Sequence, residues 1–177
     1  GKALCFVHLY RILKELDVGV DVVSSGELFT ALSGSFPADK IYFHGNNKTD
    51  RDIEYAIDSG IGYFVVDNRE EFEKISAYAG EKGIRQKILV RLSPGIDPHT
   101  HAKISTGSVD SKFGTAIETG QAEEFIKDIL KDKNVELCGY HCHVGSQIFE
   151  SEPFCDAADI MMAFSADIGK KYGFYAK

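Results

Sequence analysis

The sequence lacks a long hydrophobic run and has little cysteine, proline or positive charge. Its longest apolar run covers Ile61 to Val66, far short of the roughly 18 residues that a membrane-spanning helix needs. Basic residues number 20 against 27 acidic ones, and the net charge of -7 argues against binding nucleic acid or a membrane through a basic surface. Seventeen glycines and four prolines are too few for a low-complexity chain.

Cysteine is also scarce, with four residues scattered along the chain: Cys5, Cys138, Cys142 and Cys155. We interpret them as reduced thiols of a cytoplasmic protein. No charged segment followed by an apolar one marks a signal peptide, which agrees with that expectation. The length of 177 residues and the 44% hydrophobic content favour one domain with a sizeable core.

Short β-branched and aromatic runs recur along the chain, each closed by residues typical of turns. They predict strands at 19–23, 41–44, 63–66, 88–92 and 137–144, preceded by a first strand at Lys2. Apolar residues at helical spacing predict helices around 9–16, 28–32, 53–57, 72–79 and 125–130, and a last helix over 152–172. Asn68 to Glu71 resembles a capping box, and Gly83 suits a helix C-terminus.

This alternation predicts a parallel sheet covered by helices. Six strands fit either an open doubly wound sheet or part of a (β/α)8 barrel. A full barrel usually takes about 250 residues, so a barrel chain of 177 residues would be a piece of something larger. The polar segment 94–114 interrupts the alternation, and we expect 97–111 to be a mobile loop.

Ligands of parallel α/β folds bind at the C-terminal ends of the strands, so polar residues there are site candidates. Asp67 and Asn68 are most simply a turn and a helix cap, and Ser24 or Ser25 can be an N-cap. Arg91, at a strand end inside a core, is harder to explain without a ligand. The candidates are Asp21, Ser24, Ser25, Glu27, His44, Asn46, Asn47, Lys48, Asp67, Asn68, Arg91, His141, His143, Gly145 and Ser146.

The segment 138–147 contains the highest concentration of side chains that could bind a ligand or a metal. On a regular strand His141 and His143 share one face and Cys142 points to the other. The two histidines can be a metal pair completed by ligands from other strands, a structural pair, or a platform on which a flat ligand packs. In the last case Ser146 and the backbone after the strand suit a phosphate. We therefore expect His143 and Ser146 to face the ligand and Cys142 to face the helices.

Lys2 is the candidate nucleophile. A lysine at a barrel strand end beside carboxylates can form a Schiff base, and Asp21 and Glu27 would stand near it if the first two strands pair in parallel.

Several motifs, in order, resemble the fold-type III pyridoxal-phosphate decarboxylases, whose barrel is like that of alanine racemase. They are Gly1–Ala3, Val20–Leu28, His44–Lys48, Arg91–Ser93, Ser111–Gly114 and His143–Gln147. Within this family, His44–Lys48 and Gly145–Phe149 look most like diaminopimelate decarboxylase. The resemblance spans essentially all 177 residues and implies a partial (β/α)8 TIM barrel of about six βα units.

The resemblance also implies roles for individual residues. Lys2 matches the catalytic lysine that binds pyridoxal 5'-phosphate, and Asp21 and Glu27 match acidic residues near it. Arg91 matches an arginine beside the cofactor ring, His143 the histidine that stacks on that ring, and Ser146 a hydroxyl on the phosphate. No metal is implied, and Lys112 receives no firm role.

The implied activity is decarboxylation of meso-2,6-diaminopimelate to L-lysine and CO2 by a cytoplasmic homodimer. Residues 1–177 would be its incomplete cofactor-binding barrel domain, without the C-terminal β domain and inactive alone. Alternatives are a decarboxylase of ornithine, arginine or carboxynorspermidine, a non-catalytic pyridoxal-phosphate-binding barrel, and a metal-dependent hydrolase using His141 and His143. Ser25 stands where the family more often has glycine.

Overall fold

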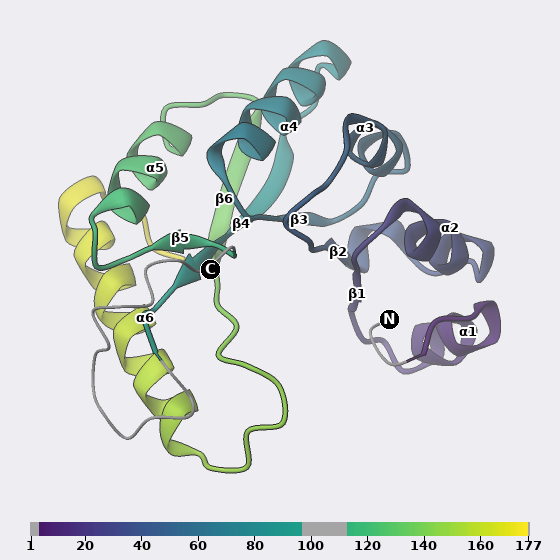
Figure 1. The fold of residues 1–177 in the computed structure, drawn as a ribbon. Coiled ribbons are helices and arrows are strands. Elements are labelled where there is room, and N and C mark those ends of the chain that lie inside the picture. The colour runs from purple at the N-terminus through teal and green to yellow at the C-terminus, as the bar shows by residue number, and fades with distance from the viewer. Residues whose placement is uncertain (1–3, 97–112, 177) are drawn as a thin grey trace.

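A computed structural model describes residues 4–96 and 113–176 of the chain. Strands and helices alternate through it (Figure 1). In chain order the elements are α1 (Val7–Glu15), β1 (Val20–Val22), α2 (Ser25–Ser33), the 3-10 helix η1 (Ala38–Lys40), β2 (Ile41–Phe43), α3 (Asp50–Asp58), β3 (Tyr63–Val66), α4 (Arg69–Lys82), β4 (Gln86–Ser93), β5 (Thr115–Ala116), α5 (Gln121–Ile129), β6 (Val135–His141) and α6 (Glu152–Tyr172).

The strands form one parallel sheet in which β1 to β4 lie side by side in chain order. β1 pairs with β2, β2 with β3 and β3 with β4, and β4 pairs with both β6 and the two-residue β5. The order never reverses, and the helices form an arc around one side of the strands (Figure 1). A doubly wound sheet has a reversal point and helices on both faces, so that alternative is wrong and the partial barrel is confirmed.

The curvature of the sheet is visible in one contact. His44 directly follows β2 and His141 ends β6, and β3 and β4 lie between these strands. In a flat sheet three interstrand spacings of roughly 4.8 Å would hold the two positions about 14 Å apart. Their ring centroids are 4.8 Å apart, because the sheet curls and turns both side chains into its concave face.

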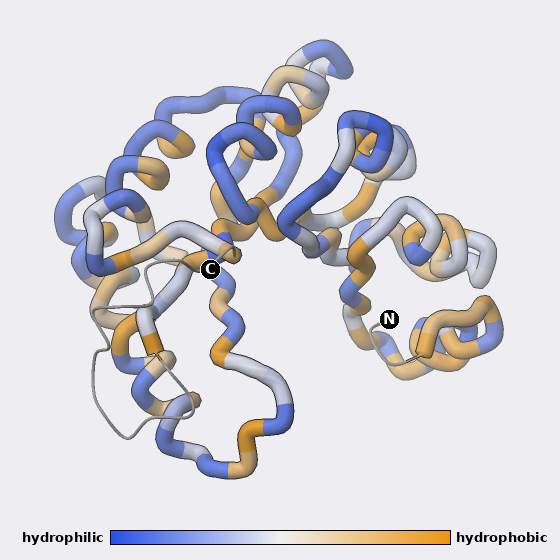
Figure 2. The backbone as a smooth tube through the Cα atoms, viewed as in Figure 1, coloured by the Kyte–Doolittle hydropathy of each residue, from blue (hydrophilic) through white to orange (hydrophobic). Residues whose placement is uncertain are grey.

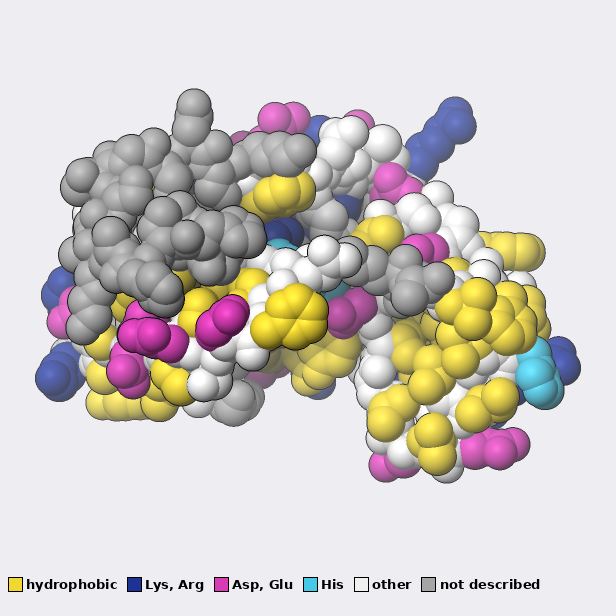
Figure 3. Space-filling model, turned by 60° about the horizontal axis from the view of Figure 1, so that its bottom comes forward, with side chains coloured by type: hydrophobic (Ala, Val, Ile, Leu, Met, Phe, Trp, Pro, Cys, Tyr) yellow, Lys and Arg dark blue, Asp and Glu magenta, His cyan; other side chains and the backbone are white. Residues whose placement is uncertain are grey.

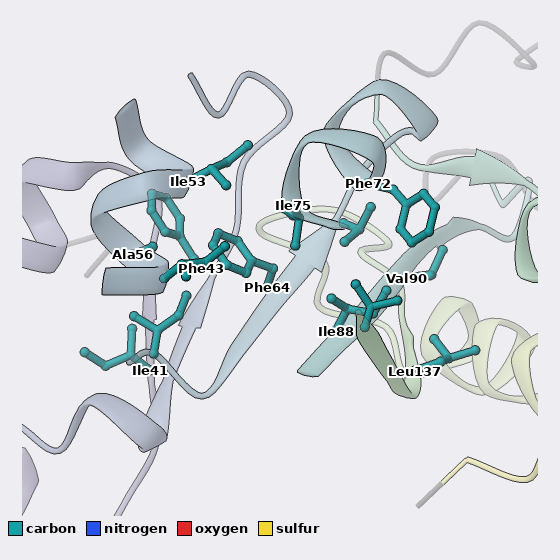
Figure 4. Packing of buried hydrophobic residues seen from close by; sticks show 14 of the residues in the cluster. Ile41, Phe43, Ile53, Ala56, Phe64, Phe72, Ile75, Ile88, Val90 and Leu137 are labelled. Carbon is teal, nitrogen blue, oxygen red and sulfur yellow. The ribbon is translucent and has the colours of Figure 1, made fainter. Parts of the chain in front are cut away.

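The hydrophobic core lies between the convex face of the sheet and the helices. In β4 the residues Ile88, Val90 and Leu92 are buried, whereas the alternate residues are more exposed on the concave face. Phe43 and Phe64 stack at 5.8 Å from neighbouring strands and meet α3 and α4 (Figure 4). Figure 2 shows the same division, with hydrophobic stretches of these helices turned toward the strands. Full burial of each large side chain stabilises the fold by about 1.5–3 kcal/mol.

Side-chain caps begin the helices that follow β1, β2 and β3. Ser24 accepts a hydrogen bond from the backbone N–H of Glu27, Thr49 from that of Asp52, and Asn68 from that of Glu71. Gly83 ends α4 in the left-handed conformation, with φ of 66°. The predicted caps at Ser24 and Asn68 and the predicted stop at Gly83 are therefore confirmed.

Five of the six predicted strands are present, and the sixth, at Lys2, lies outside the described residues. The predicted mobile loop at 97–111 also lies outside them. The predicted strand 137–144 begins and ends later than the observed strand β6, and a regular strand was expected where β6 has a bulge. It runs from Val135 to His141, and a bulge at Cys138 lets Ile88 pair with Leu137 and Leu89 with Gly139.

Candidate active site

Polar side chains gather at the mouth of the partial barrel, where the strands end. Asp21 lies on β1 and His44 follows β2, and Asp21 Oδ1 is 3.1 Å from His44 Nε2. This hydrogen bond holds the pKa of the Asp21 carboxyl below its usual range. The pair supplies an anionic carboxylate and an oriented imidazole at one side of the mouth.

His141 brings a second imidazole to the same place, packed edge to face on His44. Its Nδ1 is buried and has no hydrogen-bond partner among the described residues. Burial lowers the pKa of His141 to about 4, and the nearby His44 and Arg91 act in the same direction. His141 is therefore neutral near pH 7, with one buried ring nitrogen that has no partner among the described residues.

Arg91 projects from β4 beside these rings. Its Nη1 lies 3.5 Å from Asp67 Oδ1, and its guanidinium carbon lies 4.7 Å from the centre of the Phe113 ring. Asp67 Oδ2 also accepts a hydrogen bond of 3.1 Å from the backbone N–H of Gly114. Asp67 is only 5% exposed, so it is more than the turn residue predicted from the sequence.

A buried ion pair beneath Arg91 escaped the sequence analysis. Lys48 Nζ donates to Glu71 Oε1 at 2.7 Å and to the carbonyl oxygens of Gly45 at 2.8 Å and Val65 at 2.9 Å. The predicted capping box is only half right, because Glu71 Oε2 accepts from the backbone N–H of Asp67 at 3.4 Å. The sequence signal for this ion pair is a lysine, Lys48, only four residues after the predicted strand 41–44.

Glu27 has a local role in the described structure. Its Oε2 accepts a hydrogen bond of 2.9 Å from the backbone N–H of Val23, while its own N–H donates to the cap Ser24. This reciprocal arrangement fixes the turn between β1 and α2, so it places Glu27 at the rim. The predicted proximity of Glu27 to Lys2 stays a prediction, because Lys2 lies outside the described residues.

His143, Ser146 and Cys142 follow the end of β6. The alternation of a strand therefore does not govern these positions, and the physical reason given for their orientation does not apply. His143 and Ser146 are exposed, and burial raises the pKa of the half-buried Cys142 thiol, which also feels the charge of Arg91. The predicted cofactor roles of His143 and Ser146 remain predictions.

A cavity of about 510 Å³ lies on the concave face away from this mouth. It is lined by Tyr42, Tyr63, Lys87 and Leu89 together with residues of β6 and α6. Lys87 and Leu89 precede Arg91 along β4, so the cavity lies toward the N-terminal ends of the strands. We place the site at the mouth because ligands of parallel barrels bind at the C-terminal ends.

The mouth suits an anionic aromatic ligand better than a metal ion. Within 4–96 and 113–176, no group of three or more metal-ligating side chains is close enough to hold a metal. Arg91 and the imidazoles of His44 and His141 can donate to anionic oxygens or pack against a flat ring. The unpartnered Nδ1 of His141 is a buried polar atom that such a ligand would satisfy.

A sequence model described as "Pyridoxal-dependent decarboxylase, pyridoxal binding domain" matches residues 2–177. The chain belongs to this family. The match confirms the resemblance seen in the motifs and the expected pyridoxal phosphate cofactor.

Several relatives similar to this chain are named diaminopimelate decarboxylase. The one from Bacillus methanolicus is 46% identical over 158 residues, or 89% of this chain and 37% of that protein. The one from Staphylococcus aureus is 42% identical over 169 residues, or 96% of this chain and 39% of that protein. The chain thus spans less than half the length of these relatives.

Solved structures that carry the same name are also similar to this chain. A diaminopimelate decarboxylase from M. jannaschii superposes with a TM-score of 0.87 at 37% identity, covering 97% of this chain and 39% of that one. A second structure of that protein, in complex with L-lysine, gives the same values.

Proposed function

We propose that the intact protein converts meso-2,6-diaminopimelate to L-lysine and CO2 with pyridoxal 5'-phosphate, and that this chain supplies its cofactor-binding barrel. The observation that carries the proposal is the 42–46% identity to diaminopimelate decarboxylases over most of this chain. The similar M. jannaschii enzyme in complex with L-lysine, which is the proposed product, supports the choice of substrate.

Pyridoxal phosphate, when bound, supplies an electron-accepting ring that takes up the electron pair left when CO2 departs. The residues of this chain would bind and orient it. We assign Lys2 as the residue that holds the cofactor covalently, Arg91 as a group beside its ring, His143 as the stacking imidazole and Ser146 as a phosphate donor. These assignments rest on the family resemblance and on the position of Arg91 in the mouth.

Two further residues of the mouth, Asp21 and His141, have defined protonation states. Asp21 accepts from His44 and stays ionised, because the hydrogen bond lowers its pKa. His141 stays neutral, because burial lowers its pKa to about 4. A neutral imidazole can accept a proton or donate one, so His141 can hydrogen-bond the ligand without adding a positive charge to the mouth.

We also propose that the intact protein is a cytoplasmic homodimer. All four cysteines are free thiols, which suits a reducing compartment. In the described part of the chain no helix is both long and apolar enough to cross a membrane. Exposed apolar side chains gather on the lobe containing α1 (Figure 3), as expected of a surface that packs on further protein: Leu4, Phe6, Ile12, Leu16 and Val18.

The test is an assay of the complete gene product with pyridoxal phosphate. We expect CO2 release from meso-diaminopimelate at a far higher kcat/KM than from ornithine, arginine or carboxynorspermidine. Preference for one of the other amino acids would correct the substrate and retain the reaction. Cofactor binding without CO2 release from any of them would instead indicate a non-catalytic barrel.

A further inference from the structure

Four charged side chains form a continuous buried chain under the mouth. Lys48 contacts Glu71, Glu71 accepts from the backbone of Asp67, and the Asp67 carboxylate faces Arg91. The side chains of Lys48 and Glu71 are 1% and 4% exposed, and that of Asp67 is 5% exposed. Two positive and two negative charges balance, and Arg91, with 14% of its side chain exposed, is the most exposed of the four.

The contacts show that Lys48 is a fixed ammonium and not a nucleophile. Its nitrogen donates to three acceptors, two carbonyl oxygens and one carboxylate, at 2.7–2.9 Å. A neutral amine has only two N–H groups, so three donated bonds require the protonated form. Burial lowers the pKa of Lys48 and raises that of Glu71, and their mutual contact opposes both shifts.

The chain also joins elements that the backbone leaves separate. Lys48 ties the segment after β2 to the end of β3, and Glu71 comes from α4. Asp67 then binds Gly114, just before β5, as well as Arg91 on β4. The ends of three neighbouring strands are thereby held in one arrangement beneath Arg91.

We propose that the buried Lys48–Glu71 pair is a positioning element that holds Asp67, and through it orients the guanidinium of Arg91 toward the cofactor. Glu71 fixes the backbone of Asp67, whose Oδ2 accepts a hydrogen bond from Gly114. Its Oδ1 makes an ion-pair contact of 3.5 Å with Arg91 Nη1 but no hydrogen bond among the described residues. Neither Lys48 nor Glu71 touches the ligand. The inference rests on the proposed function, because it assigns a purpose to the position of Arg91.

The experiment is a double-variant cycle in the complete protein, with the dissociation constant of pyridoxal phosphate as the readout. Glu71→Gln keeps the shape of the side chain and removes its charge, and we expect it to weaken cofactor binding about tenfold. Arg91→Lys should weaken binding at least as much. The double variant should bind no more weakly than Arg91→Lys alone, because Glu71 acts through Arg91.

Glu70→Gln is the matched control. Glu70 directly precedes Glu71 on α4 and allows the same Glu-to-Gln change. Its side chain is exposed and pairs with Lys74 on the surface. It should bind the cofactor like the wild type. If Glu71→Gln does not fold, Lys48→Met/Glu71→Leu removes both charges together and should fold while still binding the cofactor weakly.

The outcomes separate the two proposals. Wild-type affinity for pyridoxal phosphate in Glu71→Gln or in Lys48→Met/Glu71→Leu would overturn the positioning role. The role would also be overturned if the double variant of Glu71→Gln and Arg91→Lys weakened binding by the product of the two single effects. Either result leaves the proposed function intact. A wild-type protein that binds no pyridoxal phosphate would overturn the proposed function and this inference with it.

Discussion

The ring of His44 packs edge to face on the ring of His141, with 4.8 Å between their centroids. The two residues come from strands that β3 and β4 separate, so the contact depends on the curled sheet. The charge of Arg91 also acts on His141 and, like His44, lowers its pKa. A buried imidazole in such surroundings resists protonation, and this has a measurable consequence for stability.

The first prediction concerns pH. Folding lowers the pKa of His141 from 6.5 to about 4, so between these values the unfolded chain binds a proton that the folded one does not. The free energy of unfolding should therefore fall as the pH decreases from about 6.5 to about 4. We expect His141→Phe to reduce that fall by about 1–3 kcal/mol, allowing for the partial exposure of the ring. Urea unfolding of the complete apoprotein at a series of pH values measures it.

His8→Gln is the control for that series, because His8 lies exposed on α1. It should leave the pH dependence unchanged. An unaltered slope in His141→Phe would mean that His141 is protonated as readily in the folded protein as in the unfolded chain.

The second prediction concerns the buried ion pair. Lys48→Met leaves the carboxylate of Glu71 buried without its cation, and we expect it to lower the free energy of unfolding by about 3–5 kcal/mol. Lys48→Met/Glu71→Leu removes both charges and should recover most of that loss. Chemical denaturation of the complete protein measures both values.

An exposed pair provides the comparison. Lys82 lies 2.6 Å from Asp58 on the outer surface, and Lys82→Met should destabilise the protein far less than Lys48→Met, because solvent screens an exposed pair. If Lys48→Met were as mild as Lys82→Met, the pair would have to be hydrated in solution.

Most of the fold follows from local patterns in the sequence. β3 and α6 have the predicted bounds, because each is a strong run between clear breakers. The bulge at Cys138 was not predicted, since an extra residue in a strand depends on its pairing with β4. The two-residue β5 is likewise held by β4 and has no periodicity of its own.

The site was predicted less completely, because burial of charge is decided by tertiary contacts. Asp21 and Arg91 were placed at the mouth correctly from their positions at strand ends. Glu71 was interpreted as a capping residue, since the local pattern fits and the partner Lys48 lies on another segment. The roles of His143 and Ser146 rest on the family resemblance, because β6 ends before them.

The third prediction tests Ser146. As a donor to the cofactor phosphate it would make a hydrogen bond to a charged group, worth about 1.5–3 kcal/mol. Ser146→Ala should therefore weaken pyridoxal phosphate binding by about tenfold or more. Ser151→Ala, before α6, is the control, since that side chain makes no cap hydrogen bond. Equal affinities of the two variants would remove Ser146 from the site.

The fourth prediction tests Lys2, which lies outside the described residues. A lysine must lose its proton to attack an aldehyde, and an ordinary pKa of about 10.4 makes this rare in water. Burial in a barrel mouth favours the neutral amine, whereas nearby carboxylates oppose it. We expect Lys2→Ala in the complete protein to lose both CO2 release and the visible absorbance of the covalently held cofactor.

Lys133→Ala makes the same substitution at an exposed turn before β6 and should keep both properties. The absorbance is a readout independent of turnover, so a Lys2→Ala protein that lost activity but kept the band would show that another amine holds the cofactor. Lys48 cannot be that amine, because its buried nitrogen already donates to three acceptors. Normal turnover in Lys2→Ala would withdraw the assignment of Lys2 and most of the site inferred from the resemblance.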